Sequence, residues 1–227
     1  PRARCARPRR RTRRISSPGS SASRRYRPAA SVTVVVAARD EARSIEPALR
    51  SLMAQSGDGV RVVVVDDRST DGTTEIVARL AAESEDLRVV RIDELPPGWL
   101  GKNHALQRGA EAAGDVDFVL FTDADVVFAP GAVRAIACFA DREGLDHLTG
   151  APRVEARSFA LAGMIASFGV LFALFTRPWR VRDPKRSAAV GIGALNLVRR
   201  ATYDRAGGHE AIRMRIDDDL RLGRLIK

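Results

Sequence analysis

The sequence predicts an α/β protein, built on a doubly wound, mostly parallel sheet with helices on both faces. Three features of the chain predict it: continuous β-branched runs, helix-like stretches between them, and glycines that mark the turns. Apolar runs without alternation are typical of strands buried on both faces of a parallel sheet. Hydrophobic residues make up 45% of the 227 residues, which is enough for one sizeable core.

Four predicted strands alternate with four predicted helices from residue 31 onwards. The strands are expected at 31–37, 60–66, 87–92 and 116–122. The helices are expected at 41–55, 72–84, 101–113 and 130–141. Right-handed crossovers would then join neighbouring parallel strands.

The net charge of +10 comes from residues 1–30, which hold eleven arginines and no acidic residue, so that the rest of the chain carries −1. This Arg-, Pro- and Ser-rich segment has no apolar periodicity and is predicted to be a disordered tail. Arginines without interleaved aromatic residues are weak evidence for RNA binding, so a nucleic-acid partner is not expected. Residues 31–227 are expected to form one catalytic domain that is truncated at its C-terminus.

Carboxylates gather at the carboxyl ends of the predicted strands, where parallel α/β sheets bind their ligands. Asp66 and Asp67 end the second strand, and Asp123 and Asp125 follow the fourth. Neither G-x-G-x-x-G nor G-x-x-x-x-G-K-[ST] follows a strand, so the sequence contains neither of these phosphate-binding loops. If phosphates bind at this rim, a metal is the expected means of holding them.

Asp123 and Asp125 stand one residue apart in "FTDADVVF". In an extended segment, residues i and i+2 point to the same side, so both carboxylates can face one cation. Oxygen ligands of this kind suit Mg²⁺ or Mn²⁺, which complete their shells with water and substrate phosphates. The same pair also arises by chance in a solvated loop, so alone it is a weak signal.

Five motifs occur in a fixed order along the chain: "VVVAARDEARSI", "VVVVDDRSTDGT", "PPGWLGKNHAL", "FTDADVVF" and "IDDDLRLGRLIK". With them the chain resembles the family 2 glycosyltransferases of GT-A fold, over about residues 31–227. "PPGWLGKNHAL" and the segment 182–220 are most similar to the membrane-associated branch that acts on hopanoid, carotenoid or similar lipids. The resemblance implies a nucleotide-sugar donor and a lipid-type acceptor.

The resemblance also implies roles for the matching residues. Those that bind the nucleotide-sugar would be Ala37, Arg39, Glu41, Asp66, Asp67, Lys102, Asp123 and Asp125. Asp66 and Asp67 match the pair whose carboxylate reads the uracil edge, which implies a UDP-linked sugar. Asp123 would contact the ribose side, and Asp125 would ligate the Mg²⁺ or Mn²⁺ that bridges the diphosphate.

Asp218 and Asp219 match the acidic pair of the family, with Asp219 as the catalytic base. Glycosyl transfer by direct displacement needs a base within hydrogen-bond reach of the acceptor hydroxyl, on the face opposite the leaving phosphate. Such a transfer inverts the anomeric carbon. Without the resemblance, helix capping is the simpler explanation of these residues, because they precede an apolar-periodic run.

Residues 158–176 carry no charge and are long enough for a transmembrane helix. They lie between Asp125 and Asp219, however, and a single crossing would place these two on opposite sides of the bilayer. An interfacial helix, or one partly buried in the domain, is therefore favoured. Together with the resemblance, this stretch predicts a location at the cytoplasmic face of the cell membrane.

Other functions compete with this interpretation. One is a family 2 transferase that acts on polysaccharide or a soluble acceptor. Another is a catalytically silent domain whose basic tail binds membrane or nucleic acid. A sugar-nucleotide-forming nucleotidyltransferase is disfavoured, because it needs a Gly-rich basic loop after the first strand and "AARDEARSI" has no glycine.

Overall fold

The computed structural model of the chain describes residues 30–55, 59–181, 183, 185, 186 and 188–227. The predicted tail therefore lies outside the described residues, apart from Ala30. In the described part, six strands form one sheet in the order β3-β2-β1-β4-β6-β5. The four predicted strands are parallel to one another and are β1 (Val32–Ala38), β2 (Val60–Asp67), β3 (Leu87–Ile92) and β4 (Phe118–Asp123).

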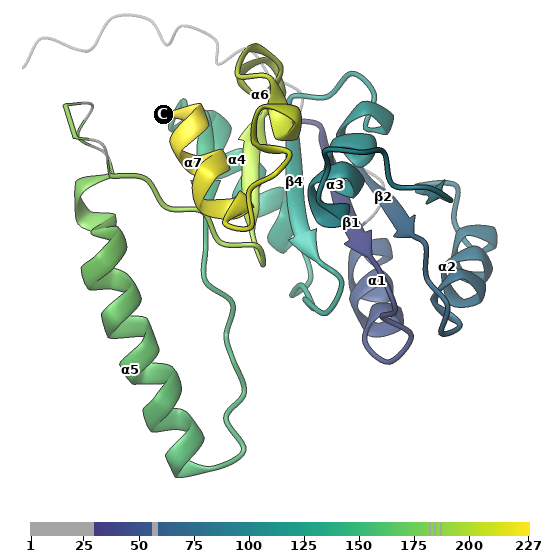
Figure 1. Cartoon of the computed structure of the whole chain (residues 1–227), viewed down its shortest axis with the longest axis horizontal. Helices are drawn as coiled ribbons and strands as arrows, with labels where there is room; N and C mark the ends of the chain where they lie inside the picture. The colour runs from purple at the N-terminus through teal and green to yellow at the C-terminus, as the bar shows by residue number, and fades with distance from the viewer. Residues whose placement is uncertain (1–29, 56–58, 182, 184, 187) are drawn as a thin grey trace, which may run out of the picture.

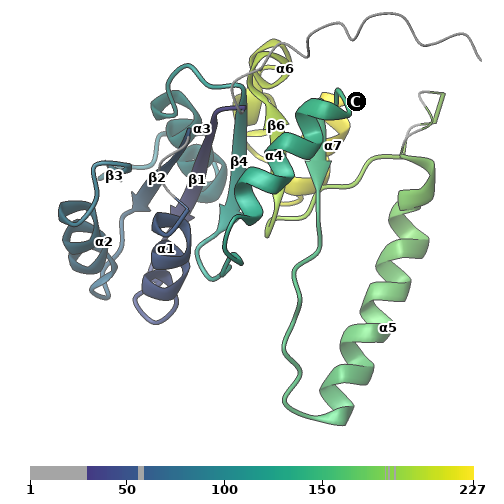
Figure 2. The same cartoon turned by 180° about the vertical axis from the view of Figure 1, so that it is seen from behind.

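Two helical layers cover the sheet. Val34 and Val36 of β1 pack toward α1 (Ile45–Met53), α2 (Thr73–Ala82) and α4 (Ala132–Arg142). Val35 points to the opposite face, because successive side chains of a strand alternate. That face is covered by α3 (Gly101–Ala112), α6 (Arg200–Arg205), η2 (Gly208–Ile212) and α7 (Asp218–Ile226). The opposite views in Figures 1 and 2 show the sheet between the two layers, which confirms the predicted fold class.

Two short strands complete the sheet beyond β4. β6 (Asn196–Arg199) pairs antiparallel with β4, and β5 (His147–Thr149) pairs antiparallel with β6. Runs of three and four residues carry no periodic signal, so the sequence did not predict these strands individually. Their pairing places the segment that precedes β6 beside the carboxyl end of β4, while α6, which follows β6, starts at the amino end of β4.

The apolar stretch forms α5 (Phe159–Thr176), which projects from the domain beside the extended segment 150–158, as Figure 1 shows. In the described residues it is the one helix long and apolar enough to cross a membrane by length and composition, and its apolar window is only 6% buried. It is followed by η1 (Pro178–Arg180). The alternative of a helix partly buried in the domain is wrong, since Thr176 is the only buried residue of α5.

The chain segment that contains α5 leaves the sheet and returns to it at the same pair of residues. Thr149 at the end of β5 is paired with Asn196 at the start of β6, so residues 150–195 form a long detour between paired strands. The segment 150–158 also carries Arg153, Glu155 and Arg157, all exposed. A lone crossing by α5 would have to return this charged segment through the hydrocarbon, which is strongly unfavourable.

Candidate active site

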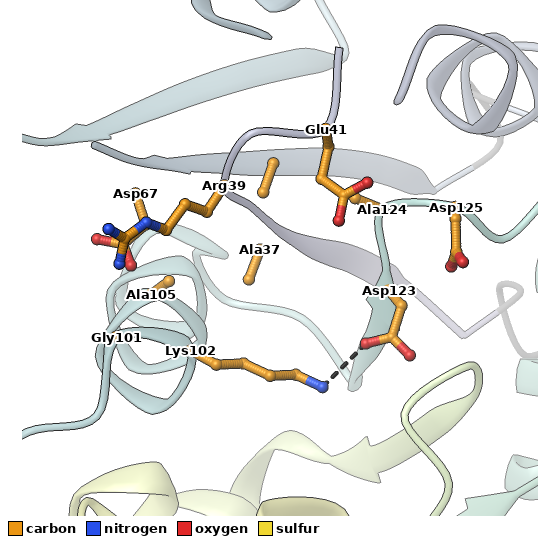
Figure 3. A pocket seen from close by; sticks show the side chains of 11 residues that line it. Ala37, Arg39, Glu41, Asp67, Gly101, Lys102, Ala105, Asp123, Ala124 and Asp125 are labelled. Carbon is orange, nitrogen blue, oxygen red and sulfur yellow. Dashed lines mark hydrogen bonds and ion pairs between the residues drawn. The ribbon is translucent and has the colours of Figure 1, made fainter. Parts of the chain in front are cut away.

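A cavity of about 420 Å³ opens at the carboxyl ends of β1, β2 and β4. The parallel register creates it, because Ala37 of β1 is paired with Asp123 of β4 and small residues leave room between the strand ends. Figure 3 shows the side chains that line it. They belong to Ala37, Ala38, Arg39, Glu41, Asp67, Gly101, Lys102, Ala105, Asp123, Ala124 and Asp125.

Hydrogen bonds brace the loop that follows β1 against the loop that follows β2. Asp40 has a positive φ of 55°, and its Oδ1 accepts a bond of 2.7 Å from the Thr70 backbone N–H. The Ala42 backbone N–H donates to Asp71 Oδ2 at 3.0 Å. These bonds fix the backbone on both sides of Glu41, so that side chain and its neighbour Arg39 stand at the rim before any ligand arrives.

Asp66 and Asp67 point to opposite faces of the sheet, as the two-residue period of a strand requires. Asp66 is buried, does not line the cavity, and accepts bonds from the Ser69 N–H at 3.2 Å and the Thr74 hydroxyl at 2.5 Å. Asp67 lines the cavity and is held by Arg68 through two bonds of 2.8 and 3.0 Å. Asp66 thus shapes the β2–α2 turn, while Asp67 faces the cavity.

Gly101 gives Asp67 the space it occupies. A Cβ at Gly101 would lie 2.6 Å from Asp67 Oδ2, closer than real Cβ contacts allow. The first residue of α3 therefore has to be glycine for this carboxylate to face the cavity. The sequence analysis did not single out Gly101, although it stands in the "PPGWLGKNHAL" motif.

Lys102 connects the cavity to the C-terminal acidic pair. Its Nζ lies 2.9 Å from Asp123 Oδ1, the contact drawn in Figure 3, and 3.8 Å from Asp218 Oδ2. Burial by itself lowers the pKa of Lys102. The negative charges of Asp219, Asp218 and Asp123 have the opposite effect and together raise the pKa of Lys102 above its usual value. Lys102 is therefore charged and offsets part of their mutual repulsion.

Asp219 lies next to Asp123 although 96 positions separate them in the chain. A Cβ at Gly193 would lie 2.7 Å from Asp123 Oδ2 and 2.9 Å from Asp219 Oδ2, so both carboxylates border the same small space. A Cβ at Gly191 would overlap the carbonyl oxygen of Asp219. The segment 191–193 packs directly against the first turn of α7 because it has glycine at both ends.

The environment changes the proton affinity of the acidic pair. Burial raises the pKa of the Asp219 carboxyl to about 6; Lys102 opposes this effect, and the charges of Asp218 and Asp123 add to it. Burial also raises the pKa of Asp218, again against the charge of Lys102. A carboxylate of this kind is ionised at neutral pH yet takes up a proton more readily than an ordinary aspartate, which suits a general base.

Asn103 holds the acidic pair in place from α3. It is buried, and its Nδ2 lies within 3.0, 3.2 and 2.9 Å of the carbonyl oxygens of Ile212, Arg213 and Arg215. The Leu100 N–H adds a bond of 3.0 Å to the Arg213 carbonyl. Asn103 was not among the predicted site residues, although its position on the apolar face of α3 is a signal that could have identified it.

Asp125 differs from its expected conformation. The extended segment predicted over 123–125 is not formed, because β4 ends at Asp123 and the chain turns at residues 124 and 125. Asp125 still lines the cavity, but it is exposed and lies beyond Asp123 along the chain in Figure 3. The i, i+2 argument therefore does not describe how these two carboxylates share the cavity.

The donor set fits a divalent cation only together with a ligand. Among the described residues, no group of three or more His, Cys, Asp or Glu side chains is arranged to hold a metal ion. Asp123 and Asp125 offer two carboxylates on one cavity, and Mg²⁺ is commonly bound by one or two carboxylates plus substrate phosphates. The residues present fit a cation that arrives with a diphosphate.

A mixed, mostly parallel sheet with this carboxylate-lined cavity at its strand ends defines the GT-A class of glycosyltransferases. The family model described as glycosyl transferase family 2 matches residues 33–205, so the chain belongs to this family. The expectation of a glycosyltransferase of this family is therefore confirmed.

Relatives and solved structures agree with this assignment. The chain is 26% identical over 194 residues to 4,4'-diaponeurosporenoate glycosyltransferase of Staphylococcus aureus, a match that covers 85% of this chain and 50% of the relative. It is 27% identical to a mannosyltransferase of Pyrobaculum calidifontis solved with GDP-Man and Mn²⁺, with a TM-score of 0.57 over 81% of this chain and 48% of that one.

A third comparison supports the fold alone. S. aureus TarS in complex with UDP has a TM-score of 0.56 at 20% identity, over 85% of this chain and 54% of that one. The chain spans about half the length of the curated relatives it matches.

We expect Asn103→Ala to destabilise the protein by about 1–3 kcal/mol, because three carbonyl groups, of which that of Ile212 is buried, lose a hydrogen-bond donor. Amide hydrogen exchange should become faster in residues 212–217 more than in β1. Urea unfolding measures the change in the free energy of unfolding. Arg108→Ala, on the exposed face of the same helix, is the control and should change little. Unchanged exchange in 212–217 would contradict the positioning role.

We expect Asp219→Asn to be more stable than the unaltered protein at pH 8 and to lose this advantage toward pH 4. The folded-state pKa of Asp219, about 6, lies above its ordinary value of 3.8. The folded state therefore binds more protons between these values, and the stability contributed by this group falls as pH rises through that window. After allowance for solvent screening, the gain at pH 8 should be on the order of 1–2 kcal/mol.

Urea unfolding at both pH values, without donor or metal, measures this effect. Asp115→Asn is the matched control, because Asp115 is exposed and has no hydrogen bond or ion pair in the described part of the chain. An advantage of Asp219→Asn that is equal at both pH values would show that burial does not raise the proton affinity of Asp219.

Proposed function

We propose that this chain is the catalytic domain of a metal-dependent, inverting glycosyltransferase that uses a nucleotide-sugar, UDP-linked, and a lipid-type acceptor at the cytoplasmic face of the cell membrane. The observation that carries the proposal is the junction at Gly193, where Asp123 from the cavity and Asp219 from α7 border one space. A donor in the cavity would have its reacting end at this junction, with a proton acceptor beside it.

The cavity provides for the donor in two parts. Asp67 and Arg39 line one side together, where the nucleoside would lie, and Glu41 lies beside Ala124. Lys102 and Asp123 line the other side, where Lys102 places a positive charge next to the diphosphate. Asp123 and Asp125 would hold the cation, which when bound neutralises charge on the leaving diphosphate.

Asp219 acts as the general base in a single displacement. The acceptor hydroxyl oxygen bonds to the anomeric carbon while the bond from that carbon to the diphosphate oxygen breaks, and its electron pair leaves with the nucleoside diphosphate. The hydroxyl proton passes to the Asp219 carboxylate, whose pKa of about 6 makes it a better acceptor than an ordinary aspartate. One displacement inverts the anomeric configuration.

Two observations favour a lipid-type acceptor over a soluble one. The exposed apolar helix α5 leads through the segment 177–193 to the first turn of α7, where Asp219 lies. The S. aureus relative is named for a carotenoid substrate, a lipid-type molecule. Both observations support the proposed membrane location.

Calorimetry with UDP tests the donor and the metal. Mn²⁺ should increase the affinity for UDP about tenfold or more. Without a cation, the carboxylates of Asp123 and Asp125 cannot compensate the negative charge of the diphosphate. Asp125→Asn should remove most of the Mn²⁺-dependent gain, while Asp115→Asn should keep it. Affinity for UDP that is independent of metal would count against a shared cation, and tighter binding of GDP would show that the donor is not UDP-linked.

Asp219→Asn tests the base. Release of UDP from a UDP-sugar, with water or membrane lipid as acceptor, should fall by about 10²–10⁴-fold, the usual contribution of a general base. UDP affinity should stay within a few fold, since Asp219 does not line the cavity. Transfer that persists would show that the base is another group.

Removal of residues 1–30 should leave UDP binding intact. A protein that acts only through its tail would instead lose its binding to membrane or nucleic acid.

A further inference from the structure

A second cavity lies at the foot of α5. It measures about 310 Å³ and is formed by the end of α5, by α7, and by Arg186, Ala188 and Ala189 of the returning chain. Four arginines line it, from three separate parts of the chain: Arg177, Arg180, Arg186 and Arg224. All four are exposed.

These arginines have few partners of opposite charge. In the part of the chain that the structure describes, no ion pair joins Arg177, Arg180 or Arg224 to a carboxylate, and Arg186 pairs with Asp183 at 3.4 Å. Four guanidinium groups around one cavity repel one another and create a strongly positive site. Guanidinium groups bind phosphate oxygens through paired hydrogen bonds, so a phosphate is the anion that this site would take.

The surroundings of the site are apolar and uncovered. α5 has no charged residue along its eighteen positions, which span about 27 Å at 1.5 Å per residue. Phe175 lines the arginine site and is 72% exposed, and Trp179 beside it is 63% exposed. Arginine and tryptophan at the end of an apolar helix are typical of the level of lipid headgroups.

We propose that the arginine site binds the phosphate headgroup of an anionic membrane lipid, while α5 inserts into the adjoining acyl layer. The charge of the site calls for an anion, and the exposed apolar surface of α5 calls for a bilayer, so an anionic phospholipid meets both requirements at once. The charged segment 150–158 stays at the surface, which limits α5 to shallow insertion.

The site is joined directly to the acidic pair. Leu220 lines it and is the residue after Asp219, and the segment that returns from the site passes Gly191 against the Asp219 carbonyl. A headgroup bound here would therefore fix α7 next to the membrane surface. Only this step rests on the proposed function; lipid binding itself does not require a donor or a reaction.

Quenching of tryptophan fluorescence by bromine-labelled lipid tests the site on the full chain. The chain has two tryptophans, and Trp99→Phe leaves Trp179 as the single reporter next to the site. We expect strong quenching by vesicles that contain about one-third phosphatidylglycerol and bromine-labelled phosphatidylcholine, and weak quenching by neutral vesicles. In that background, Arg180→Gln with Arg224→Gln should weaken vesicle binding about tenfold or more.

Matched variants separate the arginine site from general attraction by the arginine-rich tail, which all variants retain. Arg61→Gln with Arg88→Gln removes two exposed arginines near the amino ends of β2 and β3, which do not line the arginine site, and should keep quenching unchanged. Arg180→Lys with Arg224→Lys keeps the charge and should retain most of the binding. The proposal would be overturned if both pairs of Gln substitutions weakened vesicle binding equally, or if neither pair weakened it.

Inorganic phosphate distinguishes the source of the anion. If phosphate alone changes Trp179 emission while vesicles do not quench it, the site binds a free anion and the membrane assignment is wrong. UDP affinity of the Arg180→Gln, Arg224→Gln variant should equal that of the unaltered protein. A failure of lipid binding can therefore be told apart from a failure of the proposed glycosyl transfer.

Discussion

The charge of Lys102 holds together three carboxylates, from two parts of the chain, that would otherwise repel one another. Asp123 ends β4, and Asp218 and Asp219 begin α7, so the fold brings three carboxylates to one place. Burial makes their repulsion stronger than it would be in water, and an unpaired buried charge is among the most unfavourable features a protein can contain. With Lys102 between them, the pKa of Asp219 reaches only about 6. Lys102 thus sets both the stability of the junction and its ionisation at neutral pH.

Close packing without side chains makes this junction possible. Gly191 and Gly193 lie against α7, and Gly101 lies against Asp67, in each case with no room for a Cβ. Asn103 then fixes the loop before α7 through three carbonyl groups. Backbone contacts at these glycines and at the loop before α7 therefore position the carboxylates.

The parts of the fold that local physics determines could be predicted from the sequence. Long β-branched runs identify β1, β2 and β4, and parallel topology then places the acidic residues after them at one rim. The details that failed are those that local patterns do not decide. A turn replaces the extended segment expected at Asp125. β5 and β6 are too short to have a period, and the arginine site joins residues 177 and 224, which only tertiary packing brings together.

On the proposed function, the arrangement also determines the direction from which an acceptor arrives. Asp219 does not line the donor cavity, but it borders one space with the cavity residue Asp123 at Gly193. An acceptor hydroxyl would then reach Asp219 from the side of α7, where the returning segment leads from α5. Since residues 150–195 begin and end at paired strands, α5 and the junction stay on one side of the bilayer. A lipid-type acceptor can then approach from the membrane while the nucleotide-sugar enters from water.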